Sequence, residues 1–247
     1  MTRIPLKIEN CPIIESIFEI RFISNYPPEA VFGIFYQEIS TVFKNSDLIK
    51  LPIMQLPEAV RLSDPNLKYQ AHHRLEQDNQ SIGLGPHVLI FSMNKPYSGW
   101  SLWSSFIIDI LKRLTKEKVF RKIERTGLRY INVFDDEIFS IANIKINLNN
   151  DCLDKQSTSL RTEMNDEEFI KILNISNNIN INYKNENIFG SMLDLDIIKK
   201  IDLSNDEFKK ELKNILMTSH DKEKDLFFNL LTDDYINSLV PHYEEVK

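Results

Sequence analysis

Hydrophobic and polar residues alternate through residues 13–23, and this period of two is typical of a β-strand. One face of the expected strand carries Phe18, Ile20 and Phe22, which are large apolar side chains suited to a core. The charges on the other face belong either to a solvated surface or to the wall of a site. That face mixes apolar residues with both signs of charge: Ile17, Glu19, Arg21 and Ile23.

Two longer stretches of the first half have the spacing of amphipathic helices. Residues 29–43 repeat apolar side chains every three or four positions, and Pro28 stands where a helix can begin without losing a needed N–H. Residues 100–115 form a wider apolar stripe, which predicts the clearest helix of the chain. The first half is therefore expected to run β-α-β-β-β-α-β, with its remaining strands at 69–75, 81–93 and 122–134.

The second half, after residue 135, begins with short strand candidates separated by turns rich in Asn and Asp. Residues 166–174 fit a helix as well as a strand, so their structure stays open. Together with the first half, these elements predict an α+β fold of mainly antiparallel sheets, with long amphipathic helices packed on one face. Its two closely packed halves are expected at residues 1–135 and 136–247.

The segment that follows predicts one more strand and a helix. Apolar residues at 193, 195 and 197 alternate with Asp194 and Asp196, which is typical of a sheet with one face in water. Ser204 and Glu207 then have the spacing of a capping box, so a helix should begin between them. His220 is expected at the end of this helix, where its side chain would meet free carbonyls.

Three expected strands carry Glu and Arg at a spacing of two, which places the side chains one above the next on a single face. One interpretation is a set of cross-strand ion pairs in water, each contributing at most about 1 kcal/mol. The other is a partly covered, convergent set that binds an anionic ligand through Arg. The candidate ligand-binding residues are Glu19, Arg21, Arg125, Arg129, Arg161 and Glu163.

Other candidate chemistry is weak. Neighbouring residues of a strand point to opposite faces, so His72 and His73 cannot both bind one metal ion without distortion, and no metal site is expected. A single histidine of this pair acting as an acid or base with Glu76 stays open. The glycines of residues 83–86 precede a strand instead of a helix, which favours a bulge or kink over a phosphate cradle. The two cysteines, Cys11 and Cys152, lack a nucleophile signature.

Composition narrows the classes of function. The chain has a formal charge of −6 and a pI near 5.5, whereas nucleic-acid binders normally carry a basic balance, so nucleic acid is disfavoured as a partner. No apolar run is long enough to span a bilayer or to act as a secretion signal. We therefore expect a cytoplasmic protein that binds neither membrane nor cofactor.

Several short motifs resemble a sporadically distributed bacterial family that has no settled activity. They are PIIESIFEIRF at 12–22, RTGLRYIN at 125–132, and SH at 219–220 followed by LFFNLLTDDYI. The resemblance spans nearly the whole chain and implies a stand-alone protein of mobile elements, in a toxin–antitoxin or phage-defence setting. It supplies no catalytic residues. As fold or site markers it carries over Pro12, Glu15, Glu19, Arg125, Gly127, Arg129 and His220.

These observations favour a non-enzymatic binding or regulatory protein that engages a protein partner, such as a basic toxin or effector. The negative charge suits a basic partner because complementary potentials speed encounter. The rival interpretation is an enzyme or sensor that binds a small anion or nucleotide on the Arg/Glu-lined face. The sequence leaves the identity of the partner, the oligomeric state and the occurrence of any catalysis open.

Overall fold

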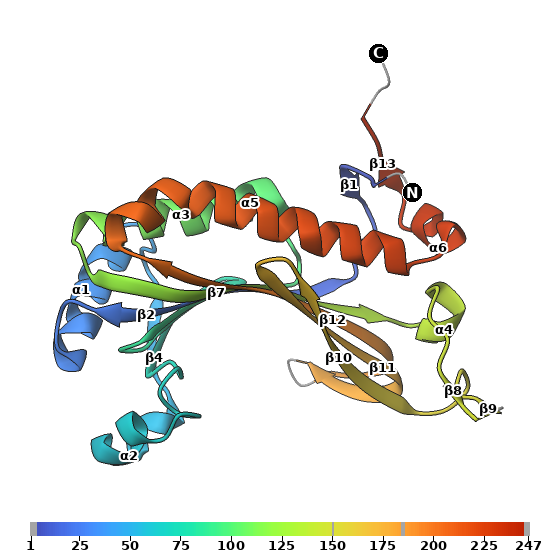
Figure 1. Cartoon of the computed structure of the whole chain (residues 1–247), viewed down its shortest axis with the longest axis horizontal. Helices are drawn as coiled ribbons and strands as arrows, with labels where there is room; N and C mark the ends of the chain where they lie inside the picture. The colour runs from blue at the N-terminus through green and yellow to red at the C-terminus, as the bar shows by residue number, and fades with distance from the viewer. Residues whose placement is uncertain (1–3, 150, 184–185, 245–247) are drawn as a thin grey trace. The chain divides into compact units, whose positions relative to one another are not determined.

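The computed structural model describes residues 4–149, 151–183 and 186–244, and Figure 1 shows the course of the chain. The helices are α1 (Pro28–Ser40), the 3-10 helix η1 (Pro52–Gln55), α2 (Glu58–Ser63), α3 (Trp100–Lys116), α4 (Ile138–Ile141), α5 (Asn205–Leu230) and α6 (Asp233–Ser238). The strands are β1 (Lys7–Ile8), β2 (Ile13–Ser24), β3 (Asp47–Lys50), β4 (His73–Gln77), β5 (Gln80–Leu84), β6 (Val88–Asn94), β7 (Phe120–Phe134), β8 (Asn147–Leu148), β9 (Asp151–Cys152), β10 (Thr158–Asp166), β11 (Phe169–Tyr183), β12 (Glu186–Leu203) and β13 (Pro241–His242).

Nine of these strands form one sheet, in the order β10-β11-β12-β7-β2-β6-β5-β4-β3. The pairs β2–β6, β3–β4, β4–β5, β5–β6 and β10–β11 are antiparallel. Two short antiparallel pairs, β1–β13 and β8–β9, stand outside this sheet. The expected α+β class with a large antiparallel sheet is confirmed, while the packing of long amphipathic helices on one face stays a prediction.

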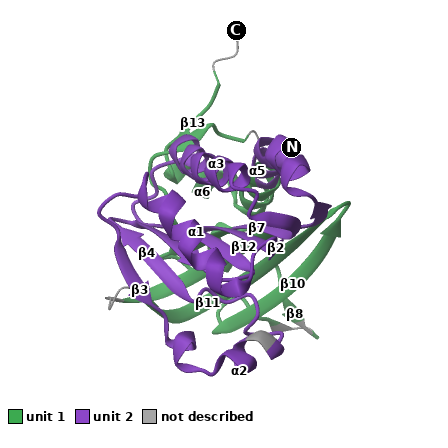
Figure 2. Ribbon diagram, turned by 90° about the vertical axis from the view of Figure 1, so that its left-hand side faces the viewer, with its two compact units in different colours: residues 1–14, 129–197, 220–247 green, residues 15–128, 198–219 purple. Residues whose placement is uncertain are grey.

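The chain divides into two compact units, coloured separately in Figure 2. Unit 1 comprises residues 1–14, 129–197 and 220–247, and unit 2 comprises residues 15–128 and 198–219. Both units draw on segments that are distant in sequence, and β2, β7, β12 and α5 contribute residues to each. The sequence predicts two continuous halves, 1–135 and 136–247, whereas the two units are discontinuous in sequence. The division into halves stays a prediction.

In unit 2, the apolar face of β2 packs on aromatic residues from other elements. The ring of Phe22 lies 5.6 Å from that of Phe35 on α1 and 5.0 Å from that of Phe120 on β7, both edge-on. Phe120 in turn meets Phe208, near the start of α5, at 6.2 Å. Each edge-on pair of rings contributes about 1 kcal/mol of stability beyond the effect of burying the two rings. The alternation of residues 13–23 therefore predicts the core face of β2 correctly.

Unit 1 has an apolar core of its own. It joins the end of β7 and α4 to β11, β12, the last turns of α5 and α6. Its buried members are Phe134, Ile138, Ile141, Ala142, Leu173, Ile175, Leu193, Leu195, Phe227, Phe228, Leu231, Ile236 and Leu239.

The helix α5 begins with the capping box that the sequence predicts. The backbone N–H and the hydroxyl of Ser204 donate to Glu207 Oε2 at 2.9 and 2.6 Å. The helix then runs 26 residues without Gly or Pro. For this reason His220 lies within the helix, and the expectation that it stands at the helix end is wrong.

The stretch at residues 166–174 is a hairpin and not a helix. The strands β10 and β11 pair from Thr158–Asn177 down to Asp166–Phe169, with a two-residue turn between them. Glu167 in this turn has φ of 55°, the left-handed conformation that tight hairpin turns require.

Two glycines allow backbones to approach closely. A Cβ on Gly85 would lie 2.6 Å from the carbonyl oxygen of Gln70, and a Cβ on Gly190 would lie 2.1 Å from that of Phe134. Gly85 lies in the turn between β5 and β6, so the expected bulge or kink within one strand is a hairpin turn instead. Both positions need glycine because a Cβ would overlap a backbone carbonyl oxygen.

Candidate functional site

The first group of predicted site residues gathers in unit 2, on the face of β2 and β7 that carries charges. Glu19 Oε1 accepts hydrogen bonds from Arg21 Nε at 2.7 Å and from Arg125 Nη1 at 2.9 Å. The three side chains are only 20%, 31% and 19% exposed, respectively. The structure thus brings Glu19, Arg21 and Arg125 together as one partly buried cluster, which we call the Glu19 cluster.

Tyr69, in the segment before β4, contacts this cluster and also its neighbour Glu124 on β7. The guanidinium of Arg21 lies 4.6 Å from the centre of the Tyr69 ring, a cation–π distance. The Tyr69 hydroxyl donates to Glu124 Oε2 at 3.1 Å. Sequence reasoning missed Tyr69, because it assigns residue 69 to a strand whereas β4 begins at His73.

A second polar group lies in unit 1. Arg129 donates to Asp194 from Nε at 2.6 Å and from Nη2 at 2.8 Å, a bidentate pair. Asn174 Nδ2 also donates to Asp194 Oδ2, at 2.9 Å, and Arg161 is the register partner of Asn174. These three residues, Arg129, Asp194 and Asn174, form what we call the Asp194 row.

The sequence assigns Asp194 to a solvated strand face, and this is wrong. Its side chain is 3% exposed, whereas that of Arg129 is 41% exposed. A buried carboxylate is tolerated when a guanidinium and an amide satisfy its oxygens, as they do here. The alternating apolar residues of β12, at 193, 195 and 197, are buried as expected.

Removing the cation from this pair is expected to destabilise the fold. In Arg129→Met the long stem remains but the charge of Asp194 loses its bidentate partner. We expect the free energy of unfolding to fall by about 2–3 kcal/mol, measured by urea denaturation. Asp194→Asn is the matched control, and it should cost only about 1 kcal/mol because the half-exposed Arg129 can turn toward water. Equal losses in the two variants would contradict this account.

The remaining predicted residues, Arg161 and Glu163, lie on β10 of unit 1. Their side chains form an ion pair with each other and are 55% and 53% exposed. This pair is the solvated kind of contact that one of the two sequence interpretations describes. The six predicted residues thus form three groups: the Glu19 cluster, the pair of Arg129 with Asp194, and the exposed pair on β10.

The neighbouring histidines are kept neutral by their surroundings. Burial, and then the nearby Arg61, lowers the pKa of His72 to about 4. Arg61 Nη1 lies 3.2 Å from His72 Nδ1, so this nitrogen accepts. His73 stacks on Phe32 at 4.1 Å, and burial lowers its pKa as well. Glu76, the suggested partner of these histidines, lies 2.6 Å from Arg74 in an ion pair.

A buried polar group occupies the face of α5 that packs in unit 1. The hydroxyl of Tyr130 lies 3.4 Å from His220 Nδ1, and burial lowers the pKa of His220 to about 3. Glu223, one turn further, is 6% exposed, and burial raises its pKa to about 8. At neutral pH the imidazole is unprotonated and the carboxyl largely protonated, which removes two charges from the interior.

No protein-family model and no curated protein sequence matches the chain. Across residues 4–149, 151–183 and 186–244, no three His, Cys, Asp or Glu side chains converge as a metal site would need. Within the same ranges, no helix has the length and apolar character needed to cross a membrane.

Proposed function

We propose that the chain is a non-enzymatic binding protein that takes an extended segment of a basic protein partner along the outer edge of β10. The observation that carries this proposal is the position of β10 as a nine-residue terminal strand of the sheet. A terminal strand presents backbone N–H and C=O groups that a further strand can pair.

The two ends of the sheet differ in how well they suit such pairing. The strand β3 at one end has four residues, two of them charged, which is a common way to protect an edge. The strand β10 has nine residues and no proline. Leu160 on β10 is 37% exposed, so an added strand would also cover apolar surface. The longer edge is therefore the better docking site.

The register of the hairpin identifies the backbone groups that would bind. A two-residue turn closes on a hydrogen-bonded pair, here Asp166 and Phe169, and such pairs alternate along the ladder. Even-numbered residues of β10 therefore bond to β11. The odd-numbered residues direct their N–H and C=O groups outward, among them Arg161 and Glu163.

Charge supports a basic partner. The chain carries a net charge of −6, which attracts a positively charged protein during encounter. The biological setting that we propose is the one implied by the resemblance, an antitoxin or a component of phage defence. The rival function, a small-anion or nucleotide sensor on the Arg/Glu faces, is less favoured because Glu19 already engages Arg21 and Arg125, and Asp194 engages Arg129.

The test uses the full chain as bait for proteins of its native host. In Glu163→Pro the outward N–H is lost while the inward ladder is kept, and we expect capture of the partner to fall at least tenfold. The matched variant Glu163→Ala keeps the N–H and should bind within about twofold of the native chain. Hydrogen exchange on the captured complex should show protection of the odd-numbered amides of β10.

Two results would overturn the proposal. One is a native chain that stays monomeric and captures nothing, and the other is equal capture by the proline and alanine variants. Circular dichroism of both variants establishes that the proline has not unfolded the chain. Should Glu163→Pro unfold, Arg161→Pro and Arg161→Ala form a second matched pair at the neighbouring outward position.

A further inference from the structure

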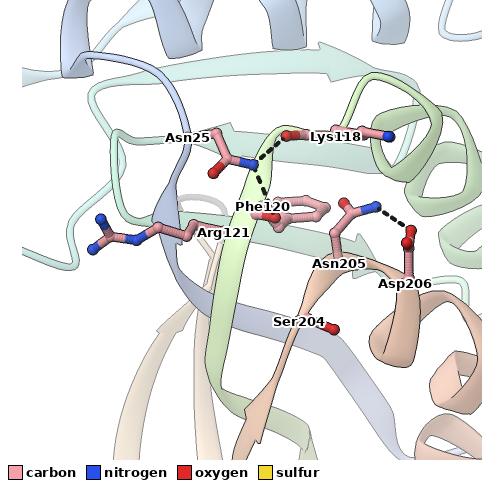
Figure 3. Close-up of a pocket in the computed structure, with 7 residues that line it drawn as sticks. All are labelled: Asn25, Lys118, Phe120, Arg121, Ser204, Asn205 and Asp206. Carbon is pink, nitrogen blue, oxygen red and sulfur yellow. Dashed lines mark hydrogen bonds between the residues drawn. The ribbon is translucent and has the colours of Figure 1, made fainter.

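Figure 3 shows a pocket of about 190 Å³ in unit 2, beside the first residues of α5. Its polar groups bond within the protein itself. Asn25 Nδ2 donates to the carbonyl oxygens of Lys118 and Phe120, and the Ser204 hydroxyl donates to Glu207 Oε2. The outer edge of β10, in unit 1, differs because the N–H and C=O groups of its odd-numbered residues point away from the sheet. This edge therefore has the greater capacity to bind another molecule.

The strand β10 has a centre about which two copies can pair over their whole length. It runs from Thr158 to Asp166, so Thr162 is its middle residue. A twofold axis through Thr162 would set two antiparallel copies of β10 side by side without an overhang. Odd-numbered residues would then face odd-numbered residues. Their outward N–H and C=O groups would form the hydrogen-bonded pairs of an antiparallel ladder.

The side chains that would meet across this axis are complementary. Arg161 would face Glu163 of the second copy, and the reverse pair would form on the other side of the axis. Leu160, which is 37% exposed, would face Met164, which packs against the core of unit 1. Moving the axis to residue 161 or 163 would shorten the ladder and set Arg161 or Glu163 against its own copy. Length and charge thus favour the same register.

The charges near β10 are balanced, although the whole chain is acidic. Each copy has a formal charge of −6, which opposes approach at long range. Within the strand, Arg161 and Glu163 form an ion pair. Asp166 Oδ2 lies 2.9 Å from Lys171 Nζ and 2.7 Å from Lys222 Nζ. The acidic residues of β10 are therefore each paired with a cation, and the surface that would meet its copy has no excess of negative charge.

We propose that β10 pairs with β10 of a second copy, so that two chains form a homodimer in which their sheets join. The edge lacks the residues that commonly block such pairing, because Thr158–Asp166 contains neither lysine nor proline. The dimer uses the edge to which we assign the basic partner, so a chain within the dimer cannot bind that partner. This regulatory consequence rests on the proposed function, whereas the dimer itself does not.

Analytical ultracentrifugation of the purified full chain tests the dimer without any partner. A single strand pair is a small interface, so we expect reversible association with a Kd in the micromolar range. Arg161→Glu and Glu163→Arg each place like charges across the axis, and each should weaken association at least tenfold. Both side chains are more than half exposed, so these variants should fold.

Two further samples restore the opposite charges. The double variant that combines both substitutions should associate within about threefold of the native chain. An equimolar mixture of the two single variants should associate equally well, because the carboxylates of one chain then face the guanidinium groups of the other.

A disulfide at the axis locates the interface independently of charge. The two copies of residue 162 would face each other as a non-hydrogen-bonded pair, in which the Cα atoms lie about 4.5 Å apart, within the range of a disulfide. The native Cys11 and Cys152 are first replaced by serine. In that chain Thr162→Cys should form a covalent dimer on oxidation. Leu160→Cys is the matched control and should form at least tenfold less, because its position faces residue 164 of the second copy.

The dimer and the proposed function fail in different ways. A native chain that stays monomeric up to about 100 μM would overturn the dimer, and so would unchanged association in both single charge variants or equal crosslinking by Thr162→Cys and Leu160→Cys. A monomeric chain that still captures a basic protein would overturn the dimer and leave the proposed function standing. A dimer that, diluted until it dissociates, captures no host protein would overturn the proposed function alone.

Discussion

Replacing Gly190 with alanine is expected to destabilise unit 1 by more than about 3 kcal/mol. The added Cβ would lie 2.1 Å from the carbonyl oxygen of Phe134, which is much shorter than a normal van der Waals contact, and 3.5 Å from the Cα of Asp135. The nearest atom belongs to the backbone, so no side-chain rotation can relieve the overlap, and β12 would have to move away from β7. Urea denaturation followed by circular dichroism measures the loss.

Gly33→Ala is the control for this substitution. Gly33 lies on the exposed side of α1, and a Cβ there would meet nothing within 4 Å. Alanine is the better helix former, so this variant should be more stable than the native chain by roughly 0.5–1 kcal/mol. If Gly190→Ala proved as stable as Gly33→Ala, the close approach of β7 and β12 would be wrong.

The second large effect concerns pH. Burial raises the pKa of Glu223 to about 8, against 4.5 for an ordinary carboxyl, with Lys224 opposing the shift. Between these two values the folded state holds a proton that the unfolded state has released. Stability therefore falls as pH rises from about 4.5 to 8, by up to roughly 5 kcal/mol. Glu223→Gln removes this loss, so the variant should be more stable than the native chain at pH 9 by several kcal/mol.

The comparison is made by urea denaturation between pH 5 and 9. His220 acts in the opposite direction, because its pKa of about 3 in the fold makes stability fall as pH drops below about 6.5. The acid-side loss should therefore persist in Glu223→Gln. Glu211→Gln, an exposed site on the same helix, is the control and should keep the native pH profile. Identical profiles for the native chain and Glu223→Gln would refute the explanation.

Local pattern predicts the elements whose residues interact with near neighbours in sequence. The alternation at 13–23 corresponds to β2 at Ile13–Ser24, the stripe at 100–115 to α3 at Trp100–Lys116, and the Ser204 box to the start of α5. In each case the pattern along one face, or the residues of one turn, predicts the element. Tertiary contacts then stabilise the structure that the local sequence already favours.

The errors occur where burial is decided by distant partners. The alternation around Asp194 fits a wet face equally well until Arg129, 65 residues away, and Asn174 are brought to it. In the same way, Tyr69 meets Glu124 across 55 residues, which no local periodicity encodes. The sequence predicts that several strands carry charged faces. Which of these charged residues contact one another depends on the order of the strands in the sheet.

The hydrogen bond from Asn205 Nδ2 to the carbonyl oxygen of Thr115 has a consequence for folding during synthesis. The two residues are 90 positions apart, so at 5–20 residues per second the end of α3 is made roughly 5–20 s before its partner. During this interval unit 2 lacks residues 198–219, which contain the start of α5 and Phe208. A nascent chain thus exposes the aromatic surface around Phe120 until Phe208 has been made, and this is the period in which a chaperone would be of most use.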